Sequence, residues 1–221
     1  MKNLKVTKGD KSMKKFILIG DSGHSKVIQD CIMSNGDIVI AKLDDKYSSP
    51  FKEGPFMKGP ISFLESIITP GIEVIIAIGH NTVRKKLSIE LAEKGIKFGT
   101  IIHKKAIISP SAIIGVGSVA MPGSVVNADA VIGNHVIINS NCTIEHDCIV
   151  RDYSHVSPNA VLTGNVKVGE GCHIGAGSNI IPSVIVGDWS IIGAGSTVIE
   201  NISNNVTAVG SPAKEIRKKD S

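Results

Sequence analysis

An aliphatic residue recurs at every sixth position from residue 108 to residue 198, without a single insertion. The series is Ile108, Ile114, Ala120, Val126, Ile132, Ile138, Ile144, Val150, Val156, Leu162, Val168, Ile174, Ile180, Val186, Ile192 and Val198. A period of six fits neither an amphipathic helix nor an alternating strand. It is typical of a left-handed parallel β-helix of hexapeptide repeats. Three hexads form one triangular coil, so residues 18 apart are expected to stack, over a little more than five coils.

Two further positions of the hexad support this interpretation. The residue after the aliphatic is glycine six times, which we attribute to tight corners: Gly115, Gly133, Gly169, Gly175, Gly187 and Gly193. The residue four positions after the aliphatic is small or β-branched and should fill the narrow interior: Ala112, Ser118, Ser124, Ala130, Val136, Cys142, Cys148, Ser154, Ala160, Val166, Cys172 and Ser178. We therefore interpret three of the four cysteines as packing residues, not as metal ligands or nucleophiles.

The front of the chain has a different pattern. Short apolar runs at 16–20, 38–45 and 74–79 alternate with helical stretches ending at Gly36 and Gly95. This alternation predicts a small Rossmann-like parallel α/β sheet. The sequence thus divides into a basic tail (1–14), an α/β domain (15–105) and a β-helix with its C-terminal tail (106–221).

The carboxyl ends of the predicted strands are the expected ligand site of the α/β domain. They carry Gly20–His24, Asp44–Asp45 and Gly79–His80. The first turn lacks the full G-x-G-x-x-G pattern and is by itself a weak nucleotide signal. Arg84 and Lys85 follow in the first turn of a predicted helix, where cations oppose the helix dipole. Either an anion binds there or both are ordinary solvated charges.

Charge and cysteine content exclude several classes of protein. Residues 1–15 carry +5 and residues 214–221 carry +2 of the net charge of +4, so residues 16–213 carry −3. A nucleic-acid-binding face would need positive charge on the folded body. No run of about 18 apolar residues predicts a membrane span, and no secretory signal is recognisable. The four cysteines form no C-x-x-C pair, and a cytoplasmic, reducing setting is expected.

The motifs along the chain resemble those of bacterial nucleotide-sugar acetyltransferases of the left-handed β-helix class. The motifs are IGDSGHSKV near the start, LDD at 43–45, AIGHNTVRKKL at 77–87, IIHKKAIISPSA at 101–112, IEHDCIVRDYSHVSPNAVLTGNVKVG at 144–169 and VGSPAKEIRK at 209–218. The resemblance is greatest to enzymes that acetylate the 4-amino group of UDP-linked amino sugars for glycan synthesis. Sialic acid O-acetyltransferases are near relatives and remain an alternative.

The resemblance implies roles for individual residues. His146 matches the general base, and Asp147 or Glu145 would orient it. Residues matching the nucleotide-sugar contacts are Ser22, Gly23, His24, Asp44, Asp45, Gly79 and Asn139. Residues matching the acetyl-CoA contacts are His155, Gly164, Ala176 and Ala194, and the VGSPAK tail would close against coenzyme A. Acetyl-CoA is thus the expected co-substrate, with no metal, and the family's homotrimer is the expected assembly.

Two other classes of protein share the repeat pattern. A γ-carbonic-anhydrase-like zinc enzyme would need three converging histidines. His135, His146, His155 and His173 supply imidazoles, but only the last two share a stacking edge. A non-catalytic trimeric sugar-nucleotide-binding protein would need neither His146 nor the tail motif. The pattern therefore favours acetyl transfer, with His146 taking the amine proton and a backbone N–H, that of Gly164 in particular, stabilising the oxyanion.

Overall fold

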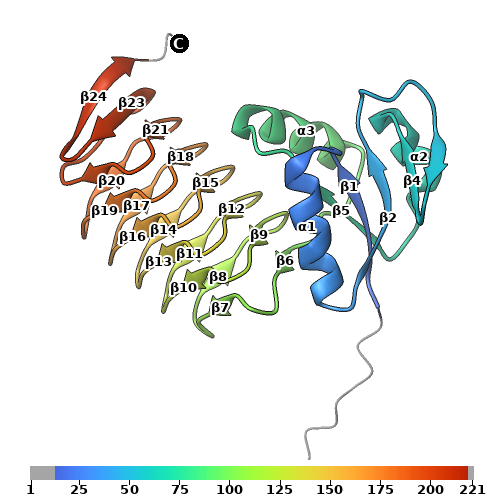
Figure 1. Cartoon of the computed structure of the whole chain (residues 1–221), viewed down its shortest axis with the longest axis horizontal. Helices are drawn as coiled ribbons and strands as arrows, with labels where there is room; N and C mark the ends of the chain where they lie inside the picture. Colours follow the sequence, from blue (N-terminus) through green and yellow to red (C-terminus); the bar gives the residue numbers. More distant parts are fainter. Residues whose placement is uncertain (1–12, 219–221) are drawn as a thin grey trace, which may run out of the picture.

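The structure is a computed structural model that describes residues 13–218. A mixed α/β domain lies beside a β-helix, and helix α1 occupies the junction between them (Figure 1). The predicted basic tail lies outside the described residues except for its last two positions. The boundary expected at residue 105 stays a prediction, although β6 (Ile101–Ile102) lies before it and already pairs with the β-helix strand β9 (Val119–Ala120).

The α/β domain contains one five-stranded sheet in the order β3-β4-β2-β1-β5. Its strands are β1 (Lys15–Ile19), β2 (Ile38–Leu43), β3 (Phe51–Glu53), β4 (Phe56–Gly59) and β5 (Ile72–Ile76). The pairs β1–β2, β1–β5 and β2–β4 are parallel, as expected, whereas β3 runs antiparallel to β4 at the edge. The sequence did not predict this edge hairpin, because its strands are short and little buried.

Helices cover both faces of this sheet. They are α1 (Gly23–Ser34), the short 3₁₀ helix η1 (Ile61–Phe63), α2 (Leu64–Ile67) and α3 (Asn81–Glu93). Side chains alternate along β1, so Phe16 packs with α1 and the first coil of the β-helix, whereas Ile17 packs with α2 and α3. The β-helix therefore completes one of the two hydrophobic layers of the domain.

The β-helix has three faces made of stacked dipeptide strands. Face I holds β7 (Ile107–Ile108), β10 (Val125–Val126), β13 (Thr143–Ile144), β16 (Val161–Leu162), β19 (Asn179–Ile180) and β22 (Thr197–Val198). Face II holds β8 (Ile113–Ile114), β11 (Val131–Ile132), β14 (Ile149–Val150), β17 (Lys167–Val168) and β20 (Ile185–Val186). Face III holds β6, β9, β12 (Ile137–Ile138), β15 (His155–Val156), β18 (His173–Ile174), β21 (Ile191–Ile192), β23 (Val206–Gly210) and β24 (Ala213–Lys218).

The interior of the β-helix contains the residues predicted from the hexad. The aliphatic series and the small residues form one hydrophobic cluster along its length. Cys142, Cys148 and Cys172 are buried free thiols, so their assignment to the interior is confirmed. Cys148 Sγ donates to the carbonyl of Thr163 at 3.1 Å, which satisfies this thiol inside the prism.

The explanation given above for the six glycines after the aliphatic positions was wrong. None of them has a positive φ; the left-handed residue of each corner lies two positions later, as in Gly117 (φ 76) and Asp147 (φ 61). A Cβ on Gly115 would lie 2.5 Å from the backbone of Gly133 in the next coil. These glycines therefore allow successive coils to approach each other, and the turns are made by other residues.

Candidate active site

The β1–α1 turn brings the first group of expected substrate residues to the end of the sheet. Gly20 has φ +103, and a Cβ there would lie 2.9 Å from the side chain of Ile78, so only glycine fits. Ser22 is the N-cap residue of α1 but makes no capping hydrogen bond, and Gly23 has open space around it. Both are exposed and available to a ligand.

A buried ionic cluster lies behind this turn, and the sequence analysis missed it. Asp21 accepts a hydrogen bond from Tyr47 at 2.7 Å and forms ion pairs with Lys58 at 2.9 Å and Lys42 at 3.6 Å. Burial raises the pKa of Asp21, but the hydrogen bonds from Tyr47 and Lys58 outweigh it and bring the pKa to about 2. No local pattern indicated this cluster, because Lys42 is a buried residue in an otherwise apolar strand.

Asp44 and Asp45 follow β2 and shape the same region through backbone hydrogen bonds. Asp44 accepts from the amide of Asp21 at 2.8 Å, and Asp45 accepts from the amide of Ile61 at 2.9 Å. The second oxygen of Asp44 accepts from the amide of Lys46 at 3.1 Å, so each carboxylate holds a neighbouring part of the backbone in place. A cavity of about 400 Å³ opens here, lined by Gly20, Asp44, Asp45 and the first half of α3. We call it the strand-end cavity.

The connection between β5 and α3 separates this cavity from a second one. Ile78 lines the strand-end cavity, whereas Gly79 and His80 line a cavity of about 340 Å³ against face III. The far wall of this junction cavity consists of β-helix residues that include His173 and Trp189. Gly79, an expected substrate contact, is therefore placed between the two domains.

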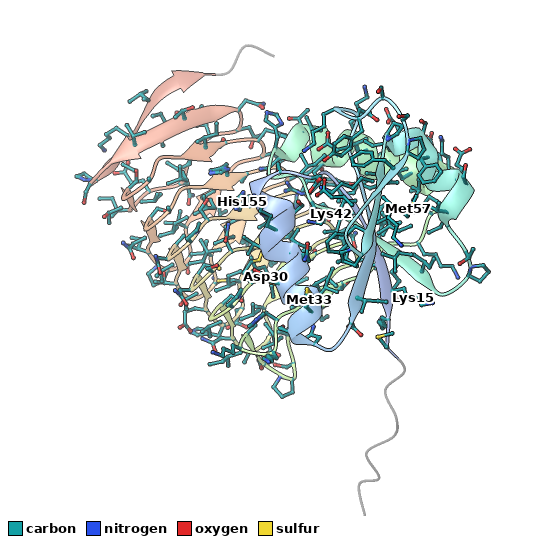
Figure 2. All side chains as sticks on the ribbon, turned by 45° about the vertical axis from the view of Figure 1, so that its right-hand side comes forward. Lys15, Asp30, Met33, Lys42, Met57 and His155 are labelled. Atoms are coloured by element: carbon teal, nitrogen blue, oxygen red, sulfur yellow. The ribbon has the colours of Figure 1, made fainter. Side chains whose placement is uncertain are left out.

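The outward-facing residues of face III change from aliphatic residues to histidines where the α/β domain no longer covers this face. Ile101, Val119 and Ile137 are each 2% exposed, because the domain packs against them. The next two positions in register are His155 and His173. Their rings lie 4.9 Å apart, as expected from the stacking of residues in adjacent coils. Figure 2 shows His155 where the β-helix faces α1.

His155 also joins two expected substrate residues. Its ring lies 6.4 Å from the ring of His24 in α1, and its Nε2 lies 2.9 Å from Nδ2 of Asn139. Asn139 Oδ1 accepts the amide of Ser140, so Nδ2 is the donor to His155. Nδ1 of His155 therefore carries the proton, and it is buried without a partner among residues 13–218.

Burial keeps these imidazoles neutral. It lowers the pKa of His24 to about 4, with a further contribution from the charge of Arg84. It lowers the pKa of His155 to about 3, with smaller contributions from His173 and Arg84. Both rings are uncharged at neutral pH. His155 can donate one hydrogen bond from Nδ1, but neither ring contributes positive charge.

His146 lies elsewhere, at the edge between faces I and II. Its Nδ1 is 2.8 Å from Oδ2 of Asp147, and this hydrogen bond raises the pKa of His146. Glu145 acts on the ring only through its charge. The left-handed conformation of Asp147 (φ 61) holds the carboxylate next to the ring it follows. Of the two carboxylates proposed to orient the histidine, the geometry favours Asp147.

The expected acetyl-CoA residues are distributed over three parts of the β-helix. Gly164 lies one coil above His146 at the same edge, and its amide N–H has no acceptor among the described residues. Ala176 and Ala194 are exposed at the edge between faces III and I, on successive coils. His155 lies on face III itself. One chain therefore does not bring the four together.

Arg84 contradicts both interpretations made from the sequence. It is 1% exposed, and it donates to carbonyls of the β-helix as well as to its own domain. It is thus neither a solvated charge nor open to an anion. Lys85 forms an ion pair with Glu170 and lies over the ring of Trp189.

Within residues 13–218, no three His, Cys, Asp or Glu side chains lie close enough together to hold a metal ion. The histidines considered for zinc, His146 and His155 among them, do not converge. Among the helices of the same residues, none is long and apolar enough to cross a membrane.

Comparison with known proteins identifies the family. The PglD N-terminal domain model matches residues 15–91, and the bacterial transferase hexapeptide model (six repeats) matches residues 129–164 and 165–200. The structure of a variant of perosamine N-acetyltransferase from Caulobacter crescentus, in complex with CoA and GDP-perosamine, is 32% identical with a TM-score of 0.87, and the alignment covers 93% of this chain and 98% of that one. This chain belongs to the PglD-type nucleotide-sugar N-acetyltransferases with a hexapeptide-repeat β-helix.

Other members of the family are similarly close. The acetyltransferase domain of PglB from Neisseria gonorrhoeae FA1090 is 34% identical with a TM-score of 0.85, covering 92% of this chain and all of that one. UDP-N-acetylbacillosamine N-acetyltransferase from Bacillus subtilis (strain 168) is 45% identical over 111 residues, which are 48% of this chain. The match spans 51% of that protein's length. The family resemblance inferred from the motifs is confirmed.

Proposed function

We propose that this protein transfers the acetyl group of acetyl-CoA to the amino group of a nucleotide-linked amino sugar of the UDP-4-amino-sugar type. The observation that carries this proposal is the His146–Asp147 pair at 2.8 Å, whose imidazole faces the space left by Gly164. Relatives were solved with CoA and GDP-perosamine and with acetyl coenzyme A. The expected setting is the cytoplasm, and the four free cysteines agree with a reducing compartment.

The proposed reaction needs one base and one oxyanion donor. The sugar amine attacks the thioester carbonyl carbon, and Nε2 of His146 takes the proton that the nitrogen releases. The Asp147 carboxylate holds Nδ1–H and so keeps Nε2 available as the acceptor. The oxyanion then collapses, the C–S bond breaks, and the proton passes to the departing CoA thiolate. The amide N–H of Gly164 is the proposed donor to the oxyanion.

The proposed contacts with the nucleotide sugar divide into a site for the nucleoside and a site for the sugar. The strand-end cavity, with Asp44 and Asp45 at its rim, is the proposed site of the nucleoside. Ser22, Gly23 and Gly79 would follow the diphosphate toward face III. The sugar would then reach Asn139 and His24 beside His155, whose imidazole is proposed to line the site of the acetyl thioester.

A homotrimer would complete this site. His146 and Gly164 lie at the edge between faces I and II, whereas His155, Ala176 and Ala194 belong to face III and its edge with face I. We propose that the first edge of one chain meets face III of the next. Exposed aliphatic side chains run up face II and would be covered by such an assembly: Ile113, Val131, Ile149 and Ile185. Light scattering that finds a fully active monomer would contradict this assembly.

The test of the proposed function is an assay of CoA release. The protein is incubated with acetyl-CoA and, in turn, with UDP-, GDP- and dTDP-linked 4-amino sugars, while the matching 4-hydroxy sugars and free sialic acid serve as controls. We expect release only with an amino sugar, and mass spectrometry should find an acetamido product. Release with sialic acid instead would support the alternative of O-acetylation. Binding of a nucleotide sugar without any turnover would support a non-catalytic binding protein.

A further inference from the structure

The side chain of Arg84 joins the two domains at the candidate active site. Its Nε donates to the carbonyl of His135 at 2.8 Å, and its Nη2 donates to Asn81 Oδ1 at 2.9 Å and to the carbonyl of Tyr153 at 2.6 Å. Its Nη1 donates to the carbonyls of Ile78 at 3.0 Å and Gly79 at 3.1 Å. All three nitrogens of the guanidinium are thus used. No carboxylate forms a salt bridge with it in the described part of the chain.

The acceptors on the β-helix belong to one vertical ladder. His135, Tyr153 and Gly171 occupy the same corner of three successive coils, and each has a positive φ (54, 62 and 63). Arg84 binds the carbonyls of the lower two. Asn81 Nδ2 binds the third, at 3.0 Å from the carbonyl of Gly171. The two side chains therefore bind backbone carbonyls of three successive coils, and we call them the Arg84–Asn81 clamp.

The other end of the clamp is the connection between β5 and α3. Its carbonyl acceptors, Ile78 and Gly79, lie on the two sides of this connection: Ile78 lines the strand-end cavity and Gly79 lines the junction cavity. The guanidinium of Arg84 thus holds the connection that borders both cavities against the coils that precede and include His155. Small shifts in this connection would change where a ligand at the strand ends lies relative to face III.

We propose that Arg84, completed by Asn81, is a positioning residue that sets the place of the nucleotide sugar relative to the acetyl-transfer face. This inference rests on the proposed function. Arginine suits the role because its rigid fork presents five N–H donors, whereas the three donors of a lysine leave from a single atom. The cation is buried with neutral acceptors only, and its hydrogen bonds to carbonyls offset part of the cost of desolvation.

The buried charge of Arg84 also affects the imidazoles beside the site. Burial lowers the pKa of Arg84 to about 10, so the group stays charged at neutral pH. Its charge adds to burial in lowering the pKa values of His24 and His155. Loss of the cation should therefore leave these two rings easier to protonate. Burial is the larger cause in both rings, so they should stay neutral over the range in which His146 titrates. The pH midpoint of kcat is therefore a second readout, because it reports whether the base is intact.

The clamp can be tested with steady-state kinetics on the full-length protein. The nucleotide-linked 4-amino sugar that the wild type acetylates fastest is used with Arg84→Met, Arg84→Lys and Asn81→Ala. We expect kcat/KM for the sugar to fall about 10²-fold in Arg84→Met, as for a misplacement of about 1 Å. Arg84→Lys should recover part of the loss. The Kd of acetyl-CoA, measured by calorimetry, should change much less than kcat/KM for the sugar, because its expected contacts Gly164, Ala176 and Ala194 lie away from the clamp.

A control and a second readout separate positioning from general stability. Lys97→Met removes a lysine from an exposed position after α3 and should leave kcat/KM at the wild-type value. Assays run well below the melting temperature of each variant. In Arg84→Met, the pH midpoint of kcat should stay at the wild-type value, because His146 sets it and Arg84 is not among the groups that shift the pKa of His146. If Arg84→Met does not fold, the same measurements on Asn81→Ala decide the question.

The positioning role and the proposed function would be contradicted by different results. If the wild type acetylates a nucleotide sugar and folded Arg84→Met does so with unchanged kcat/KM, the clamp is only structural. Equal losses in sugar kcat/KM and acetyl-CoA affinity would also overturn it, because they indicate a general disturbance. If the wild type acetylates no amino sugar, the proposed function fails, and the positioning role fails with it.

Discussion

Gly164 lies one coil above His146, and a Cβ at Gly164 would lie 2.7 Å from both Cε1 and Nε2 of the imidazole. Real Cβ atoms do not approach other atoms so closely. Because Gly164 has no side chain, the His146 ring can lie beside it while Nδ1 donates its hydrogen bond to Asp147. Nε2, the atom proposed to take the amine proton, faces the space that this glycine leaves open.

Gly164→Ala should displace the imidazole while the protein stays folded. Gly164 has no positive φ, so alanine meets no backbone strain, and its edge position is only partly buried. We expect kcat to fall by about 10² as the base leaves its position. The melting temperature should stay near that of the wild type. A variant with normal kcat would show that the position of the ring is not important for catalysis.

His146→Ala tests the base itself. Removal of a general base typically lowers the rate by about 10²–10⁴-fold, so kcat should fall by this factor. The Kd of acetyl-CoA should hardly change, since the base acts on the amine and not on the cofactor. Stopped assays and calorimetry measure the two quantities separately. If only KM rose, or if turnover stayed near normal across pH 6–9, another group such as His24 would have to be the base.

Asp147→Asn should move the pH dependence of kcat. The hydrogen bond that His146 donates to Asp147 raises the pKa of His146, and the base must be neutral, so the rate rises with pH through that pKa. Without the carboxylate the pKa falls, and the midpoint should move to lower pH while the plateau drops. Glu145→Gln is the matched control, because Glu145 acts only through its charge. A larger shift in Glu145→Gln than in Asp147→Asn would reverse the assignment.

Cys148→Ser should retain most activity although Cys148 lies two residues from His146. The thiol points into the prism, and burial raises its pKa to about 11, so almost no thiolate exists at neutral pH. A serine hydroxyl can donate to the same carbonyl of Thr163. Cys172→Ser, in the same slot one face away from Cys148, provides the control. A loss of turnover in Cys148→Ser alone, in a folded protein, would indicate an acyl-enzyme.

His135 should make stability fall in acid. It is 6% exposed, and burial lowers its pKa to about 4, below the value of 6.5 for a free imidazole. The unfolded chain therefore binds more protons between these values. The contribution is complete above pH 6.5 and is lost as pH falls toward 4, by roughly 3 kcal/mol.

His135→Asn tests this pH dependence. Asparagine tolerates the positive φ of 54 at this corner but cannot titrate. The variant should melt earlier at pH 7, because the ring packs against Phe98 and Tyr153. Its melting temperature should nevertheless fall less steeply than that of the wild type between pH 6.5 and 4. Parallel curves for the two proteins would mean that other groups, such as His24 and His155, account for the whole slope.

Local patterns in the chain were enough to predict the β-helix and the ends of the central strands. A period of six leaves one way to bury an aliphatic residue in every hexad, so the interior cysteines and the stacking of His155 on His173 followed from spacing alone. In the α/β domain, the apolar runs predicted β1, β2 and β5 and the ligand site at their carboxyl ends. Local periodicity was sufficient here because each element buries a face defined by its own sequence.

The places of the polar side chains of the site, by contrast, depend on contacts between residues far apart in the chain. Arg84 looked like a surface cation, because its acceptors lie 51 and 69 residues away at His135 and Tyr153. Asp21 and Lys42 meet inside the domain for the same reason. Such groups are buried when distant carbonyls or carboxylates satisfy them, and no local pattern encodes those partners. The junction beside His155 likewise exists only because the α/β domain covers face III, where Ile101, Val119 and Ile137 are buried.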